Sequence, residues 1–147
     1  MYLLDTNIVS ADASAKRRVG SDAFAAWVRE RGDRLYLSTV TVAEIEAGIA
    51  SAVRIGATTK AERLRRWLAA VEHFYAGRIL AFGIEEARHA GAILDRARSH
   101  DPGFEDIAIA ATAAAHGFTV LTANERHFTP LCVPLANPLK QLPEASA

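Results

Sequence analysis

Cysteine is almost absent from this sequence, since Cys132 is the only one among 147 residues. No disulfide can therefore form within the chain, and no cluster of cysteine and histidine has the spacing of a structural zinc site. These absences exclude the small disulfide-stabilised class of secreted domains and are typical of proteins from a reducing compartment.

Long hydrophobic runs and an excess of one charge are also missing. The apolar start at Met1 stops at Asp5, too early for a signal peptide, and no run reaches the ~20 residues of a membrane span. We therefore expect a soluble, cytoplasmic protein. The 17 basic and 17 acidic side chains cancel, so a surface that binds nucleic acid would have to be a local patch.

Glycine is missing from the segment that follows the first expected strand, Asp5-Thr6-Asn7-Ile8-Val9. A phosphate-loop NTPase or a dinucleotide-binding enzyme needs a glycine-rich turn at this place, so both classes are disfavoured. An aspartyl-phosphate phosphatase would resemble Asp-x-Asp here, and Asn7 stands in the second position. No other nucleophile is evident from the sequence.

What the chain does contain is typical of a globular domain, with 50% hydrophobic and 23% charged residues. We expect one domain over residues 1–147, with a loose tail from about residue 138. Apolar runs and helical spacing predict strands at 2–4, 35–37, 79–82, 119–122 and 133–136, and helices at 21–31, 41–55, 59–75, 84–98 and 104–116. Alternation of the two predicts an α/β three-layer sandwich, with a parallel sheet of about five strands between helices.

Capping-box spacing marks the expected starts of two of these helices. Thr41 is followed by Glu44, and Thr59 by Glu62, each three residues later. Such pairs satisfy amide groups of the first turn that have no partner within the helix.

Three acidic residues stand where a parallel sheet would bring them to one edge. Asp5 ends the first strand, Glu44 lies in the expected first turn after the second strand, and Asp106 begins the helix that leads to the 119–122 strand. At ~4 Å and a dielectric near 20, each like-charged pair costs on the order of 4 kcal/mol. A cation would offset this cost, and oxygen ligands favour Mg²⁺ or Mn²⁺. Such a site suits phosphodiester hydrolysis.

Each acid also has a purely structural interpretation. Asp5 could cap a helix that starts at Thr6, Glu44 could be only the third residue of the Thr41 capping box, and Asp106 could be favoured by the helix dipole. The placement of all three at strand ends makes the joint structural explanation the weaker one.

Four segments resemble, in order, the motifs of the PIN-domain family. They are Asp5-Thr6-Asn7, Thr39 to Ile45 with Gly48 after it, Asp106 to Ala113, and Thr122-Ala123-Asn124 with His127-Phe128. Ala76 to Leu80 and Asn137-Pro138 also resemble the FitB-like branch of the VapC toxins. The resemblance covers residues 1 to about 138, and four motifs in order are far more specific than one.

The resemblance implies a Mg²⁺- or Mn²⁺-dependent endoribonuclease that is the toxin of a toxin–antitoxin pair. Asp5, Glu44 and Asp106 match the three catalytic and metal-binding acids of the family, with Glu44 binding directly or through water. Thr6 and Asn7 would support them. VapC-type toxins usually form homodimers and are blocked by an antitoxin encoded beside them, so RNA, an antitoxin and a second copy are the implied partners. The alternative is a catalytically inactive module that binds RNA or protein.

The fourth motif departs from the common pattern, because Asn124 stands where many members of the family have aspartate. Its amide oxygen could bind metal directly or through a water, so Asn124 is the fourth candidate ligand. Glu105 is adjacent to Asp106, but one residue along a helix turns the side chain by about 100°, and we expect it to face solvent. His127 is the one histidine near the motifs.

Two groups of basic residues could contact an RNA backbone, although such groups are more often a solvated face. They are Lys16-Arg17-Arg18 and the set Arg63, Arg65 and Arg66. The aromatic side chains of the 59–75 helix are expected in the core or in a dimer interface.

Overall fold

The computed structural model describes residues 1–13 and 21–144, and its centre is a parallel sheet. The strands are β1 (Tyr2–Leu4), β2 (Leu35–Ser38), β3 (Ile79–Leu80), β4 (Thr119–Leu121) and β5 (Leu135–Ala136). They are ordered β3-β2-β1-β4-β5, and all four pairings are parallel. The expected α/β class with five parallel strands is confirmed, although β3 and β5 are shorter than predicted.

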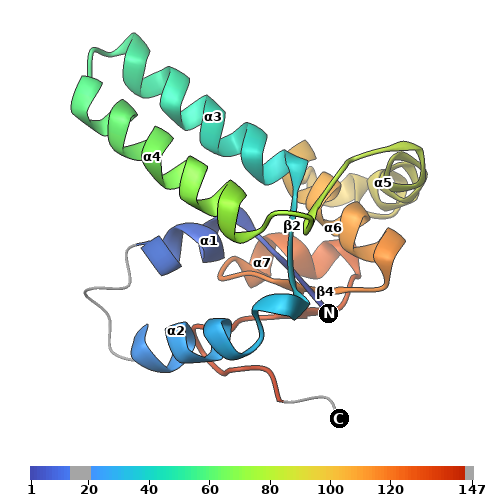
Figure 1. Ribbon diagram of the computed structural model, residues 1–147. Coiled ribbons are helices and arrows are strands. Elements are labelled where there is room, and N and C mark those ends of the chain that lie inside the picture. The colour runs from blue at the N-terminus through green and yellow to red at the C-terminus, as the bar shows by residue number, and fades with distance from the viewer. Residues whose placement is uncertain (14–20, 145–147) are drawn as a thin grey trace.

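Helices cover the sheet on both faces (Figure 1). They are α1 (Thr6–Ala13), α2 (Ser21–Glu30), α3 (Thr39–Arg54), α4 (Thr58–Phe74), α5 (Ile84–Arg96), α6 (Phe104–His116) and α7 (Glu125–Phe128), with 3-10 turns at Gly32–Arg34, Arg98–His100 and Thr129–Leu131. In the described ranges, no helix is long and apolar enough to cross a bilayer.

Consecutive residues of the central strand enter two different hydrophobic clusters. Leu3 packs with buried residues of α5, α6 and the segment 128–131, whereas Leu4 packs with α1, α2, β2 and the end of α4. The neighbouring strand repeats the pattern, because Val120 lies in the first cluster and Leu121 in the second. This alternation follows from the strand period of two and gives the sheet two buried faces.

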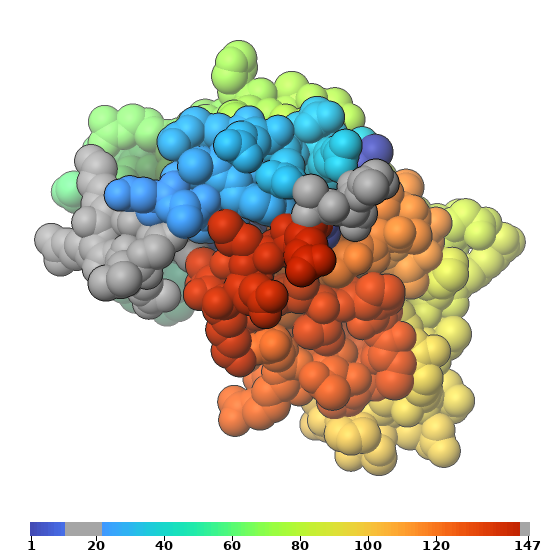
Figure 2. Space-filling view, turned by 90° about the horizontal axis from the view of Figure 1, so that it is seen from below, coloured from blue at the N-terminus to red at the C-terminus, as the bar shows by residue number. Residues whose placement is uncertain are grey.

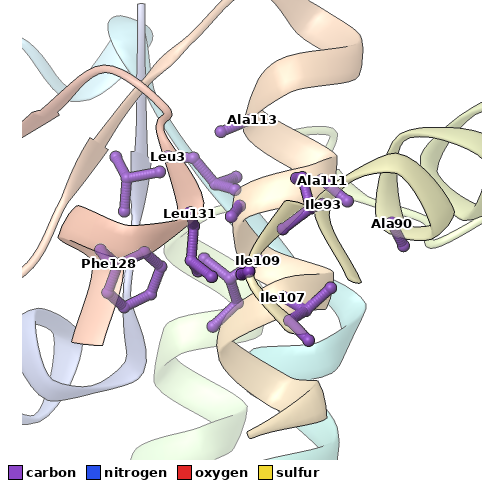
Figure 3. Close-up of a cluster of buried hydrophobic side chains, with 12 residues drawn as sticks. Leu3, Ala90, Ile93, Ile107, Ile109, Ala111, Ala113, Phe128 and Leu131 are labelled. Atoms are coloured by element: carbon purple, nitrogen blue, oxygen red, sulfur yellow. The ribbon is translucent and has the colours of Figure 1, made fainter. Parts of the chain in front are cut away.

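Helix α6 carries the small side chains that the sequence shows from Ile107 onward. Every residue from Ile107 to Ala113 is at most 1% exposed. Figure 3 shows Ile109 beside Leu131, with Phe128 and Ile107 on either side of them in the same cluster. Alanine lets the helix lie close to both the sheet and α5, so the start of α6 is fixed firmly relative to the strand ends.

The predicted capping boxes are both wrong. Helix α3 begins at Thr39, and its cap is Ser38, whose hydroxyl accepts from Val40 N at 3.1 Å. Thr41 is instead completely buried, and Glu44 lies in the second turn, not the first. Helix α4 follows Ala57 without a side-chain cap.

Helices α3 and α4 form a hairpin that extends beyond the sheet (Figure 1). Ile45, Ile49 and Leu68 form its own small core, with Trp67 partly buried against it. Of the aromatic residues of the expected 59–75 helix, Tyr75 is buried and Phe74 is 48% exposed.

The segment after Pro138, expected to be loose, is held at two points. The Lys140 ammonium pairs with the Glu125 carboxylate of α7, and Leu142 packs against the cluster that contains α2. In Figure 2 the C-terminal segment lies directly against the α2 region.

Candidate metal-dependent active site

Asp5 lies at the carboxyl end of β1, where the chain turns into α1. Its amide donates to Leu121 O of β4 at 2.9 Å, and the residue is 4% exposed. The carboxylate accepts three hydrogen bonds: Oδ1 from Thr6 N at 2.7 Å, and Oδ2 from Asn7 Nδ2 at 2.7 Å and Thr122 Oγ1 at 2.8 Å. Asp5 therefore precedes the helix as the capping interpretation expects, but its Oδ2 is held by two side chains.

The two residues after Asp5 connect it to neighbouring elements. The Thr6 hydroxyl donates to Glu44 Oε2 and lies 3.3 Å from Thr41 Oγ1, both on α3. Asn7 donates to Asp5 through Nδ2 and accepts from Ala123 N through Oδ1 at 3.1 Å. Thr6 and Asn7 thus link β1, α3 and the loop after β4.

Glu44 lies half-buried in the second turn of α3, facing Thr6. Burial raises the pKa of Glu44, the Thr6 hydrogen bond lowers it, and the charges of Asp106 and Glu105 raise it again. Because the helix begins five residues earlier, Glu44 cannot be the third residue of a capping box. Its position against Thr6 is instead that of a side chain directed at the end of β1.

Asp106 lies in the first turn of α6 with its side chain 23% exposed. Its Oδ2 lies 3.2 Å from Nδ1 of His127 on α7. Its charge raises the pKa of both Asp5 and Glu44, so the three predicted acids interact electrostatically across three separate elements. We call Asp5, Glu44 and Asp106 the acidic site.

Comparison with known proteins identifies the fold that carries this site. The sequence profile of the PIN domain matches residues 2–130. This chain belongs to the PIN-domain family. The PIN chain is 33% identical to the VapC ribonuclease Y4jK of Sinorhizobium fredii, over 94% of this chain and 97% of that protein. It is 32% identical to the toxin FitB of Neisseria gonorrhoeae, over 94% of this chain and 98% of that protein.

A solved structure agrees with the arrangement of the PIN chain. The crystal structure of FitAcB from Neisseria gonorrhoeae matches it with a TM-score of 0.76 at 32% identity, over 94% of this chain and 98% of the other. The predicted family and the three-layer fold are therefore confirmed.

Burial is what most perturbs the charge state of Asp5 in this PIN domain. It raises the pKa of Asp5 from 3.8 to about 6, helped by the charges of Asp106 and Glu44 and opposed by the hydrogen bonds from Thr122 and Thr6. Ionising Asp5 in the folded protein thus costs on the order of 3 kcal/mol relative to the unfolded chain. A nearby cation would offset that cost.

The donor set fits a hard divalent cation, because carboxylate, hydroxyl and amide oxygens surround the end of β1. Within residues 1–13 and 21–144, however, no three acidic, histidine or cysteine side chains stand close enough to hold one metal ion jointly. Mg²⁺ keeps several of its waters and is usually bound through only one or two carboxylates. The residues present therefore fit a partly hydrated ion that would be held by one or two of these carboxylates.

Asn124 joins the hydrogen-bond network of the acidic site through its backbone amide, and Glu105 adjoins Asp106 on α6. The Asn124 amide N–H donates to Thr122 Oγ1 at 2.9 Å, and in the described ranges its half-buried side chain has no hydrogen-bond partner. Glu105 is exposed, as expected, and acts on Glu44 only through its charge.

The sequence argument missed the role of Thr122. This fully buried threonine donates to Asp5 and accepts from Asn124 N. The sequence contains part of the signal, because Thr122 follows β4 as Asp5 follows β1. The structure supplies the rest, which is the pairing of Leu4 with Leu121 in register. Thr41 was also misassigned, since the sequence argument made it a cap and it lies against Thr6.

Of the two predicted basic groups, one lies within the described residues. Arg63, Arg65 and Arg66 are exposed on α4. Lys16-Arg17-Arg18 lies outside the described residues.

We predict that Mg²⁺ stabilises this PIN domain more at pH 7.5 than at pH 4.5. The folded pKa of Asp5 is about 6 and its reference value is 3.8, so the folded state binds the proton more tightly. The contribution of Asp5 to the free energy of unfolding therefore falls as pH rises from about 4 to 6, and a cation restores it above that range. Urea unfolding at both pH values, with Mg²⁺ and with chelator, measures the difference.

The matched control for this experiment is Asp5→Asn, in which residue 5 cannot ionise, so the pH-dependent response to Mg²⁺ should be much smaller than in the wild type. Equal stabilisation by Mg²⁺ at the two pH values in the wild type would contradict the assignment of Asp5.

We also predict that Thr122→Val raises the pKa of Asp5 further, because the carboxylate loses one hydrogen-bond donor. The same change should lower the free energy of unfolding by about 1–3 kcal/mol, since it also leaves the Asn124 N–H without its acceptor. Thr122→Ser keeps the hydroxyl and should stay close to the wild type. The measurement is urea unfolding across pH in chelator, which locates the Asp5 transition. If the valine and serine variants had the same transition pH, Thr122 would not position Asp5.

Proposed function

We propose that this chain is a metal-dependent endoribonuclease. The observation that carries the proposal is Asp5, a carboxylate buried at a parallel-strand end with a raised pKa and with two further acids close enough to raise it. Proteins keep such unfavourable clusters mainly where function requires them. Similarity to a VapC ribonuclease over nearly the whole chain supports the same activity.

A bound Mg²⁺ or Mn²⁺ would supply an activated water and neutralise charge on the phosphodiester. Asp5 and Asp106 would hold the ion directly, and Glu44 would bind it through water or orient the attacking water. Thr6 donates to Glu44 and so fixes which carboxylate oxygen faces the site. Asn124 would be a secondary ligand, because a neutral amide contributes less charge to a cation site than a carboxylate.

The biological role that we propose is that of the toxin in a toxin–antitoxin pair, acting on RNA in the cytoplasm. The similarity to the toxin FitB over 94% of the chain supports it. The partners would be RNA, a cognate antitoxin and a second copy of the chain, with part of α4 around the exposed Phe74 in the homodimer interface. Light scattering that gives a monomer at micromolar concentration would count against the homodimer.

The second candidate function is a catalytically inactive module that binds RNA or protein. The presence of all three acids in electrostatic contact disfavours it, since a binding module gains nothing from their repulsion. A cleavage assay separates the two functions.

The variants should rank by their place in the acidic site. Asp5→Ala and Asp106→Ala should lose essentially all cleavage of single-stranded or loop RNA, Glu44→Gln nearly all, and Asn124→Ala only part. Chelator should stop cleavage, and Mg²⁺ or Mn²⁺ should restore it. The measurement is endonucleolytic cleavage of an end-labelled RNA, resolved on a gel.

Glu105→Gln is the matched control, because it removes an exposed carboxylate next to Asp106 and should retain most of the activity. RNA cleavage that persists in chelator, or that survives Asp5→Ala in a preparation free of other nucleases, would refute the mechanism and favour the binding module.

A further inference from the structure

A pocket of about 320 Å³ adjoins the acidic site. Its walls are the segment that precedes α6, the first turn of α6, and α7 with the turn after it. The lining residues are His100, Asp101, Pro102, Gly103, Asp106, Arg126, His127 and Pro130. Asp106 belongs both to this pocket and to the acidic site, so whatever fills the pocket lies next to the candidate reaction centre.

Arg126 is the permanent cation of this pocket. Its side chain is exposed, and in the part of the chain that the structure describes no carboxylate pairs with it. A guanidinium binds phosphate through two parallel hydrogen bonds, which makes it the side chain best suited to a phosphodiester. An unpaired arginine beside a cluster of acids also offsets the repulsion that those acids exert on an RNA backbone.

The rest of the lining suits the remainder of a nucleotide. Asp101 offers acceptors for base amino groups and for the ribose hydroxyl, and His100 and Pro102 offer flat or apolar surfaces. A volume of about 320 Å³ is at the lower end of the range for small-ligand pockets. One nucleotide therefore fits this space better than a duplex, which needs an open groove.

The pocket walls are held in place by contacts within the protein. His127 lies 3.2 Å from Asp106 and thus joins α7 to α6 across the pocket. Proline at residues 102 and 130 fixes the backbone on two sides. A preformed pocket binds with less loss of conformational entropy.

A second pocket of about 350 Å³, lined by residues that include His89, Arg96 and Cys132, offers no such argument. Arg96 already donates to Leu131 O at 2.6 Å, and none of the lining residues belongs to the acidic site.

We propose that the pocket beside Asp106 binds the RNA nucleotide that adjoins the cleaved phosphodiester, and that Arg126 binds the phosphate of that nucleotide. The proposal rests on the ribonuclease function proposed above and adds to it a subsite that positions the substrate. Arg126 acts on binding and leaves the chemical step to the acidic site.

The first test removes the charge. Binding of a fluorescein-labelled single-stranded RNA of about ten nucleotides is followed by anisotropy in Mg²⁺, in a Glu44→Gln background that should cleave only very slowly. We expect Arg126→Ala to weaken binding about tenfold, the size of one lost charge-assisted contact. The slope of log affinity against log salt should fall by roughly 0.7, the value for one phosphate contact on a single strand.

Arg29→Ala is the matched control, because it removes an exposed arginine from α2, an element that contributes no residue to the pocket. It should bind RNA as the parent protein does. Arg126→Lys keeps the charge but loses the two parallel hydrogen bonds of the guanidinium, so its RNA affinity should fall between those of Arg126→Ala and the parent protein. In the cleaving wild-type background, Arg126→Ala should raise KM with kcat nearly unchanged.

The second test fills the space and leaves the charge in place. Gly103 has the ordinary extended backbone angles φ −62 and ψ 144, and an added Cβ would meet only Glu105 Oε2 at 3.4 Å. Gly103→Ala should therefore be tolerated. Gly103→Leu adds bulk at the pocket wall and should weaken RNA binding more than the alanine variant, with equal thermal stability showing that both are folded.

The outcomes separate this proposal from the function on which it rests. Suppose that the protein cleaves RNA but that Arg126→Ala has the same RNA affinity, salt slope and KM as Arg29→Ala. This result would overturn the pocket proposal and leave the ribonuclease proposal standing. Binding that depends on Arg126 without any cleavage would support the pocket and overturn the ribonuclease. Absence of RNA binding would overturn both.

Discussion

The structure depends on one electrostatic constraint, a carboxylate placed at the end of the central strand and almost removed from water. Asp5 is 4% exposed, yet it must be able to ionise for the site to hold a cation. Three hydrogen bonds reduce the cost of its charge, and each donor comes from a residue whose position is fixed by β1, α1 or β4. The sheet, the turn into α1 and the chain after β4 therefore have to form together.

The two other acids are brought to Asp5 by opposite means. Asp106 is positioned near Asp5 because α6 is built from small buried residues and lies close to the sheet and α5. Glu44 lies on a helix whose far end extends beyond the sheet, and the hydrogen bond from Thr6 connects its carboxylate to the end of β1. The position of Asp106 thus follows from packing, whereas that of Glu44 relies on a hydrogen bond.

The class of fold and the three acids could be predicted from the sequence, because a parallel sheet brings the carboxyl ends of its strands to one edge. The start of α3 could not, whereas the expected starts of α2, α5 and α6 at residues 21, 84 and 104 agree with the structure. Ser38, Thr39 and Thr41 are all plausible caps, and burial of Thr41 beside Thr6 decided among them. The role of Thr122 depends on the register of β1 against β4, which no local pattern encodes. The pocket with Arg126 depends on the path of two connecting segments, and short-range propensities do not determine such paths.

The junction of β1 and α1 also has an evolutionary consequence. Asp5, Thr6 and Asn7 are consecutive, and their side chains reach Thr122, Glu44 and Ala123 respectively. Inserting or deleting a single residue here would rotate all three away from their partners at once, whereas the turn at Gly56 between α3 and α4 joins two helices far from these contacts. Insertions and deletions among descendants of this chain should therefore be tolerated at the α3–α4 turn and selected against at the end of β1.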